Sequence, residues 1–108
     1  MILSPTIFVI SSILKFLYGY EGINLLFSIL PSKFIVLILK KYGATLGVGI
    51  RIQSPFLIHN ADQVEPIYSN LKIGDDCYIG RDCIFDLMEN ITIGDQVTIS
   101  HRAILNTH

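Results

Sequence analysis

The residues of this chain that are best suited to chemistry are its three histidines, His59, His101 and His108. An imidazole ring changes its charge near neutral pH, so it can take up or release a proton during a reaction. Histidine also binds metals, but His101 and His108 stand seven positions apart and His59 lies much earlier, with no acidic residues evident to orient the rings. The sequence therefore favours proton transfer, and we expect no metal site.

The two cysteines, Cys77 and Cys83, do not have the spacing of a reactive pair. Five residues separate them, which matches neither a CxxC redox motif nor a zinc knuckle. Free cysteine usually behaves as a small apolar residue of the core. We therefore expect both thiols to be reduced and buried.

Length, composition and charge exclude several classes of protein. With 108 residues the chain can build one small core, which excludes an enzyme with separate cofactor and substrate lobes. Hydrophobic residues make up 51% and charged residues 16%, which excludes a disordered tail and suggests that a partner covers part of the apolar surface. The formal net charge of −1 offers no broad positive face, so we expect no nucleic-acid partner.

The elements that must position the histidines begin with a helical segment over residues 1–43. Ser4 followed by Pro5 is typical of a helix start, and apolar residues then recur at helical spacing, which predicts a helix over residues 4–18. Two shorter apolar stripes follow, and the last of them ends at two lysines and a glycine, as is typical of the end of a helix. Lysines and a proline interrupt the apolar runs, so no uninterrupted stretch of about 18 apolar residues remains that could cross a membrane.

From residue 44 the period of the apolar residues changes to six. The nine apolar positions are Leu46, Ile52, Ile58, Ile73, Ile79, Phe85, Ile93, Ile99 and Leu105. The residue after each is mostly small or polar, as tight turns require. A second apolar residue often follows four positions after the first, and two inward side chains in six residues fit a solenoid of short strands stacked in parallel. Residues 59–70 interrupt the repeat and are expected to form an inserted loop.

Residues 73–80, IGDDCYIG, and residues 93–100, IGDQVTIS, resemble the repeats of the hexapeptide-repeat acyltransferases, and the resemblance extends over residues 44–108. It implies a mainly β fold, in which N-terminal α-helices precede a partial left-handed parallel β-helix. Three repeats would then complete each turn of the helix. With this spacing the expected neighbours are Ile73 and Ile93, Ile79 and Ile99, Phe85 and Leu105, Asp86 and Asn106, Cys77 and Val97, and Cys83 and Ala103.

The same resemblance implies a function and a site. Thr107-His108 is similar to the Thr-His pair of the maltose, galactoside and polysaccharide O-acetyltransferases, in which the histidine is the general base. His108 is therefore the predicted catalytic base, with acetyl-CoA, or another acyl-CoA, as donor and a hydroxyl of a sugar or polysaccharide precursor as acceptor. Asp86, Asn106 and His101 are the predicted substrate-binding residues. The gamma-class carbonic anhydrases resemble this fold and bind zinc through histidines, but the spacing of the histidines argues against zinc here.

Further expectations concern assembly and location. The resemblance implies a homotrimer with active sites between subunits. The N-terminus lacks a basic region and an obvious cleavage site, so we expect a cytoplasmic protein. The chain ends in the middle of a repeat, which predicts a truncated family member. Two alternatives stay open: a catalytically silent homologue that acts as an oligomerisation or interaction module, and a protein that contacts the surface of a membrane through residues 1–42.

Overall fold

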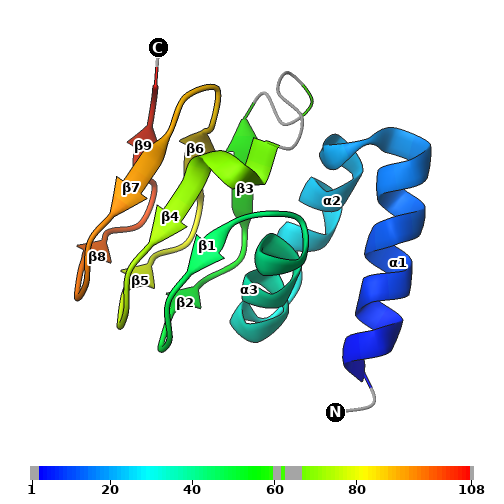
Figure 1. The fold of residues 1–108 in the computed structure, drawn as a ribbon, viewed down its shortest axis with the longest axis horizontal. Coiled ribbons are helices and arrows are strands. Elements are labelled where there is room, and N and C mark those ends of the chain that lie inside the picture. The colour runs from blue at the N-terminus through cyan, green and yellow to red at the C-terminus, as the bar shows by residue number, and fades with distance from the viewer. Residues whose placement is uncertain (1–2, 60–61, 63–66, 108) are drawn as a thin grey trace.

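The computed structural model describes residues 3–59, 62 and 67–107 (Figure 1). Three helices open this part of the chain. They are α1 (Leu3–Tyr18), α2 (Tyr20–Phe27) and α3 (Ser32–Lys41). The helix expected over residues 4–18 corresponds to α1. None of the described helices combines the length and the apolar character that crossing a bilayer would require.

The joint between α1 and α2 depends on a residue from the inserted loop. Gly19 has a positive φ of 70°, which favours glycine, and the carboxylate of Asp62 lies against it. Asp62 accepts hydrogen bonds from the backbone N–H of Tyr20, at 2.7 Å, and of Glu21, at 3.2 Å. These two N–H groups belong to the first turn of α2, so Asp62 caps this helix from a distant part of the sequence.

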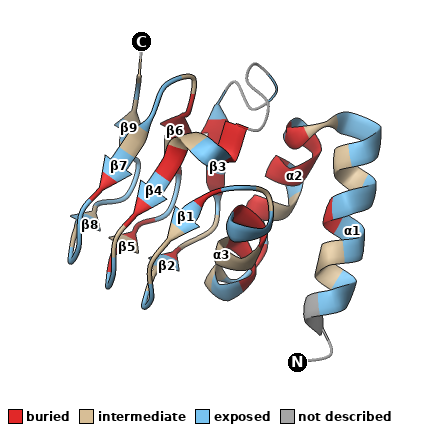
Figure 2. Cartoon of the chain, viewed as in Figure 1, coloured by how far each residue is buried: buried red, intermediate tan, exposed pale blue. Residues whose placement is uncertain are grey.

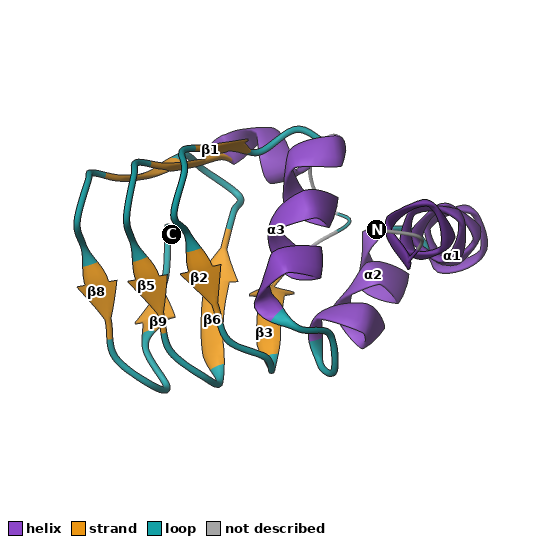
Figure 3. Ribbon diagram, turned by 90° about the horizontal axis from the view of Figure 1, so that it is seen from below, coloured by secondary structure: helices purple, strands orange, loops and turns teal. Residues whose placement is uncertain are grey.

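Nine short strands follow in the described residues, and a single 3₁₀ turn, η1 (Ile67–Asn70), precedes the fourth. The strands are β1 (Thr45–Leu46), β2 (Arg51–Ile52), β3 (Phe56–His59), β4 (Leu71–Ile73), β5 (Tyr78–Ile79), β6 (Cys83–Asp86), β7 (Ile91–Ile93), β8 (Thr98–Ile99) and β9 (Ile104–Leu105). They form three parallel sheets, with strand orders β1-β4-β7, β2-β5-β8 and β3-β6-β9. The chain therefore visits the three sheets in the same order three times, and we call each visit a pass (Figures 1 and 3).

The register between the second and third passes agrees with the prediction made from the six-residue period. Ile73 pairs with Ile93, Ile79 with Ile99, and Phe85 with Leu105. The first pass pairs in the same way, since Leu46, Ile52 and Ile58 lie beside Ile73, Ile79 and Phe85. The expected alignment of the apolar positions is therefore confirmed.

The predicted fold class, a mainly β chain with a left-handed parallel β-helix after N-terminal helices, is wrong. The helices contain 16, 8 and 10 residues, which is more than the strands of two to four residues contain together. In the described part of the chain the strands form three separate three-stranded sheets, and no closed β-helix is present. Helices and sheets pack into one body of 33 × 32 × 21 Å.

The fold differs from the predicted class because of the way in which the helices contact the strands of the first pass. A strand at the edge of a sheet has unpaired backbone groups, which must be satisfied when they are covered. The side-chain amide of Asn24 in α2 donates to the carbonyl oxygen of Ile58 at 3.0 Å and accepts from its N–H at 3.1 Å. At the start of α3, the hydroxyl of Ser32 accepts from the N–H of Ile52 at 2.8 Å. The helices thus complete the sheet edges, and they belong to the same folding unit as the strands.

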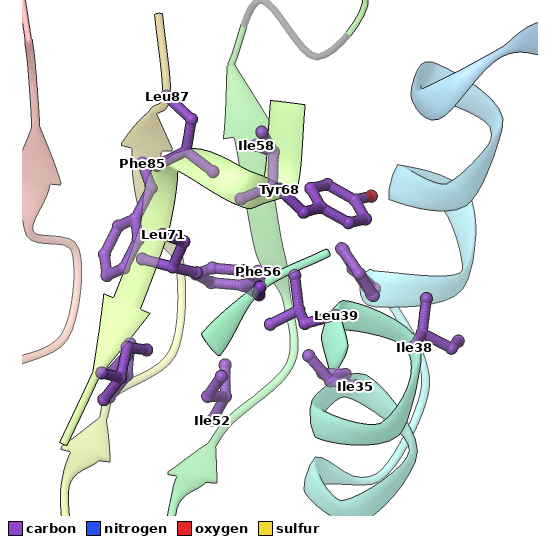
Figure 4. Close-up of a cluster of buried hydrophobic side chains, with 14 of the residues drawn as sticks. Ile35, Ile38, Leu39, Ile52, Phe56, Ile58, Tyr68, Leu71, Phe85 and Leu87 are labelled. Carbon is purple, nitrogen blue, oxygen red and sulfur yellow. The ribbon is translucent and has the colours of Figure 1, made fainter. Parts of the chain in front are cut away.

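A single core joins the two kinds of element (Figures 2 and 4). The ring of Phe56 lies between the rings of Phe27 in α2 and Phe85 in β6, at centroid distances of 5.8 Å and 5.1 Å. Cys77 and Cys83 are free and buried, which confirms the prediction of interior thiols. The buried cluster includes apolar residues of α2, α3, the strands and η1, so the inward positions of the six-residue period pack against the helices as well as against each other.

Candidate functional site

The turns between the first and second sheets form one corner of the structure, which we call the acidic corner. Asp75 and Asp95 occupy equivalent places in the second and third passes. Oδ1 of Asp95 accepts from the N–H of Asp75 at 2.7 Å, and Oδ1 of Asp75 accepts from the N–H of Val48 at 2.9 Å. Each aspartate therefore binds a backbone N–H group of the preceding pass, and this contact links neighbouring turns.

The turns between the second and third sheets form the corresponding basic corner, which contains Arg81, His101 and Arg102. Here Nδ1 of His101 accepts from the N–H of Arg81 at 3.0 Å, so histidine makes the contact that aspartate makes at the acidic corner. The turns also stack through their backbones, because the N–H of Arg102 donates to the carbonyl oxygen of Arg81 at 2.9 Å. His101 therefore has a structural role through one of its two ring nitrogens.

Gly80 makes room for this arrangement. A Cβ atom at this position would lie 2.6 Å from Nδ1 of His101 and 2.8 Å from its backbone nitrogen, both closer than real contacts allow. Gly74 holds the equivalent place at the acidic corner, where a Cβ would lie 2.9 Å from the backbone nitrogen of Asp95. The sequence signal for this contact therefore consists of two residues in neighbouring passes. One pass has a glycine, and the next pass has, one residue after the position equivalent to that glycine, a side chain that accepts a hydrogen bond.

The hydrogen bond to Nδ1 determines what His101 can do chemically. A neutral imidazole that accepts at Nδ1 carries its proton on Nε2. In this state Nε2–H donates a hydrogen bond and cannot take up a proton, so the ring suits an anionic ligand better than it suits general base catalysis. The predicted substrate-binding role of His101 stays a prediction and is compatible with this geometry.

The basic corner opens into a hollow of about 400 Å³, lined by Arg81, Asp82, His101 and Arg102. Arg81, His101 and Arg102 are exposed, and among the described residues no hydrogen-bonding or ionic partner of either guanidinium group is found. Arginine binds phosphate and carboxylate groups through two parallel N–H donors. Two free guanidinium groups and one Nε2–H group could thus bind an anion with several oxygen atoms.

A second hollow adjoins the first, because Asp82 lines both. This hollow has a volume of about 300 Å³ and lies between β3 and β6, where Pro55, Leu57 and Ile84 give it a mainly apolar wall. At Asp82 a mainly apolar hollow thus adjoins a hollow whose lining includes two arginines. Such a surface suits an elongated ligand with an apolar arm and an anionic end.

The other predicted site residues lie around the end of β6. Asp86 is 2% exposed, and its Oδ1 accepts from the N–H of Met88 at 3.0 Å and from the hydroxyl of Thr107 at 3.4 Å. The same hydroxyl accepts from the N–H of Glu89 at 3.2 Å. Asp86 thus holds a turn together, and its predicted contact with substrate stays a prediction.

The structure brings some of the predicted site residues together and separates others. Asn106 is exposed and follows the Phe85–Leu105 pair at the end of β9, and its expected place beside Asp86 stays a prediction. His101 belongs to a different corner, before β9. The predicted base, His108, lies outside the described residues.

One buried phenol has a strongly shifted pKa but lies away from both hollows. Burial raises the pKa of Tyr68 well above its usual value, and the nearby Tyr20 and Asp62 add to the effect. Its hydroxyl has no hydrogen-bond partner among the described residues, and its ring packs on that of Tyr20 at 5.0 Å. Tyr68 is therefore neutral at physiological pH and belongs to the core.

Metal binding has no support from the described residues, since no group of three or more histidine, cysteine or acidic side chains comes together there. The two residues that sequence reasoning missed are Arg81 and Arg102, because an arginine after a turn is common at any protein surface.

Comparison with known proteins gives no family for this chain: no protein-family model, no curated protein and no solved structure matches it.

Proposed function

We propose that this chain belongs to an O-acyltransferase that moves an acyl group from acyl-CoA to a hydroxyl of a sugar or polysaccharide precursor. The observation that carries the proposal is the apolar hollow that leads into the basic corner. An acyl-CoA has the matching shape, since a long, weakly polar arm carries the thioester at one end and phosphate groups at the other. The resemblance of residues 73–80 and 93–100 to acyltransferase repeats supports the same substrate class.

The two ends of the donor would contact different residues. The arm would lie along Leu57 and Ile84, where contact with apolar carbon removes water from both surfaces. The phosphate groups would lie against Arg81 and Arg102, with Nε2–H of His101 as a further donor. Asp82, between the two hollows, would repel a phosphate placed too far towards the arm and so favour one orientation.

The chemical step needs a base and a means to stabilise negative charge. The acceptor hydroxyl oxygen attacks the thioester carbonyl carbon, the C–S bond breaks, and the hydroxyl proton passes through a general base to the departing CoA thiolate. His101 does not fit the role of base while its Nδ1 accepts from the N–H of Arg81. His108 therefore remains the residue to which we assign proton transfer.

Location and assembly follow from the same proposal. A cytoplasmic site of action agrees with two free, buried cysteines, since cytoplasmic thiols are kept reduced. We also propose a homotrimer, because an acceptor site completed by a second subunit would supply groups that the hollows of one chain lack. The alternative of a catalytically silent interaction module predicts assembly without thioester turnover.

The proposal is tested by following the release of free thiol from acetyl-CoA in the presence of candidate sugars, with the full chain and with the His108→Ala variant. We expect turnover that depends on both substrates and falls at least a hundredfold in the variant, as for loss of a general base. Equal rates in the two proteins would remove His108 as the base. Absence of turnover with every acceptor, together with assembly into trimers, would favour the interaction module.

A further inference from the structure

The outer face of α1 is an apolar surface that nothing in the described chain covers. Its large side chains are exposed, and Phe16 is the most exposed of them at 87%. They are Val9, Ile10, Ile13, Phe16 and Leu17. These positions repeat at the helical spacing of three, four and seven residues, so they occupy one face of the helix.

The opposite face of α1 attaches the helix firmly to the rest of the protein. Ser11 is buried there, and its hydroxyl lies 3.1 Å from the hydroxyl of Tyr42, which is also 3.1 Å from the hydroxyl of Ser12. Nζ of Lys41 donates to the Ser12 hydroxyl at 3.2 Å and lies 4.8 Å from the ring centre of Phe8. The helix is therefore held by its inner face, and the apolar outer face is presented to the surroundings.

Figure 3 shows α1 at the end of the molecule farthest from the third pass, with α2 and α3 between it and the strands. The charges divide along the same direction. Residues 1–42 contain four lysines and one glutamate, and with Asp62, which caps α2, the helical end has a net charge of +2. Residues 43–59 and 67–107 contain four basic and six acidic residues, a net charge of −2. The apolar face of α1 thus belongs to the positively charged end of a molecule whose other end is negative.

This distribution of charge distinguishes between the possible occupants of the face. A second copy of the chain docked through α1 would bring two positively charged ends together, which costs free energy. An anionic lipid surface offers both an apolar layer for the side chains and negative headgroups that attract the positively charged end of the molecule. The exposed Lys40 and Lys41 contribute to the positive charge of this end of the molecule, which attracts such headgroups.

We propose that α1 lies in the plane of an anionic membrane, with Phe16 and its apolar neighbours in the boundary between headgroups and acyl chains. A helix of 16 residues is about 24 Å long, shorter than the hydrocarbon layer, so it rests in the surface and does not cross it. This inference goes beyond the acyltransferase proposal and does not depend on it.

The test is flotation of the full chain with vesicles of pure phosphatidylcholine and with vesicles that contain one third phosphatidylglycerol. We expect binding to the anionic vesicles that weakens as salt is added, and at least tenfold weaker binding of the variant with Phe16→Ser and Leu17→Ser. The matched control is Val48→Ser with Ile104→Ser, which removes two similarly exposed apolar side chains outside the helices and is expected to bind as the parent does. Circular dichroism checks that both variants are folded.

Several results would overturn the proposal. Equal binding to neutral and anionic vesicles would show that the lysines do not contribute to binding. Equal loss of binding in the two double variants would show that the apolar face of α1 is not the contact surface. Sedimentation without lipid tests the competing occupant: a dimer that dissociates on Phe16→Ser, in a chain that binds no vesicle, would assign the face to a second copy. Because thiol release from acetyl-CoA is measured without lipid, failure of either proposal leaves the other testable.

Discussion

The acidic corner and the basic corner are built in the same way but carry different charges. At each, a side chain of the third pass accepts a hydrogen bond from a backbone N–H of the second, from Asp75 to Asp95 and from Arg81 to His101. In both, a glycine directly precedes the donor residue and lies under the acceptor. The difference is that the first corner presents carboxylates to solvent, whereas the second presents two guanidinium groups and an imidazole beside the single carboxylate of Asp82.

The two corners show which side-chain groups the stacked turns require and which they merely tolerate. The turn requires an acceptor atom and an empty space where a Cβ would be, and aspartate meets the first need without a positive charge. Arg81 and Arg102 contribute backbone groups to the stacked turns, whereas their side chains have no partner among the described residues. Positive charge at this corner is therefore available for a ligand.

The largest expected effect comes from filling the space that the two glycines leave. Gly80→Ala and Gly74→Ala should each lower the free energy of unfolding by about 1–3 kcal/mol, because the new Cβ meets backbone atoms that cannot easily move. Gly94→Ala is the matched control, since no described atom lies within 4 Å of its Cβ position. Urea denaturation measures all three, and a Gly94→Ala variant as unstable as Gly80→Ala would contradict this explanation.

Removal of the two guanidinium groups should affect binding and leave stability almost unchanged. The variant with Arg81→Gln and Arg102→Gln is expected to bind CoA at least tenfold more weakly, while its free energy of unfolding stays within about 0.5 kcal/mol of the parent. Calorimetric titration with CoA measures the affinity. Lys72→Gln, at an exposed position on β4, is the control for a change in overall charge, and an equal loss of affinity in this control would show that no particular corner is involved.

The acidic corner should respond in the opposite way. Asp95→Ala removes the acceptor for the N–H of Asp75, and we expect a loss of about 1 kcal/mol in stability with unchanged affinity for CoA. The same denaturation and titration experiments apply. A gain of several-fold in affinity would mean that the electric field of the whole molecule matters more than contacts at the basic corner.

The smallest effect concerns the second nitrogen of His101. His101→Asn keeps an acceptor for the N–H of Arg81 and loses the Nε2–H donor, so stability should be almost unchanged and CoA affinity should fall about threefold. If stability and affinity fall together, the role of this histidine is confined to the hydrogen bond that holds the turn.

How much of this could be predicted from the sequence differs between the two halves of the chain. The six-residue period predicted the pairing of Ile73 with Ile93 and the burial of Cys77 and Cys83 correctly, because apolar spacing directly reflects which side chains point inward. The fold class was wrong, since periodicity within each segment says nothing about contacts between segments. Asn24 and Ser32 join helices to strand edges through single side chains, which no repeat pattern reveals.

The candidate site was predictable only in part, for a similar reason. The stacking of the turns that carry Asp75, Asp95 and His101 follows from the register, but their hydrogen bonds to N–H groups twenty or more residues away depend on the exact path of each turn. Arg81 and Arg102 became candidates only when the structure placed them in one hollow. These corners could have been found from the sequence by a search for a glycine in one pass together with Asp or His in the next pass, one residue after the equivalent position.

The most direct test of the central claim follows the backbone amide chemical shifts of the full chain while CoA is added. If the basic corner binds the phosphate groups of CoA, the amides of Arg81, His101 and Arg102 shift strongly and saturably. Those of Leu57 and Ile84 then shift as well, because the long arm lies against them, and those of Asp75 and Asp95 stay in place. Shifts centred on the acidic corner, or no saturable shift at either corner, would contradict this claim.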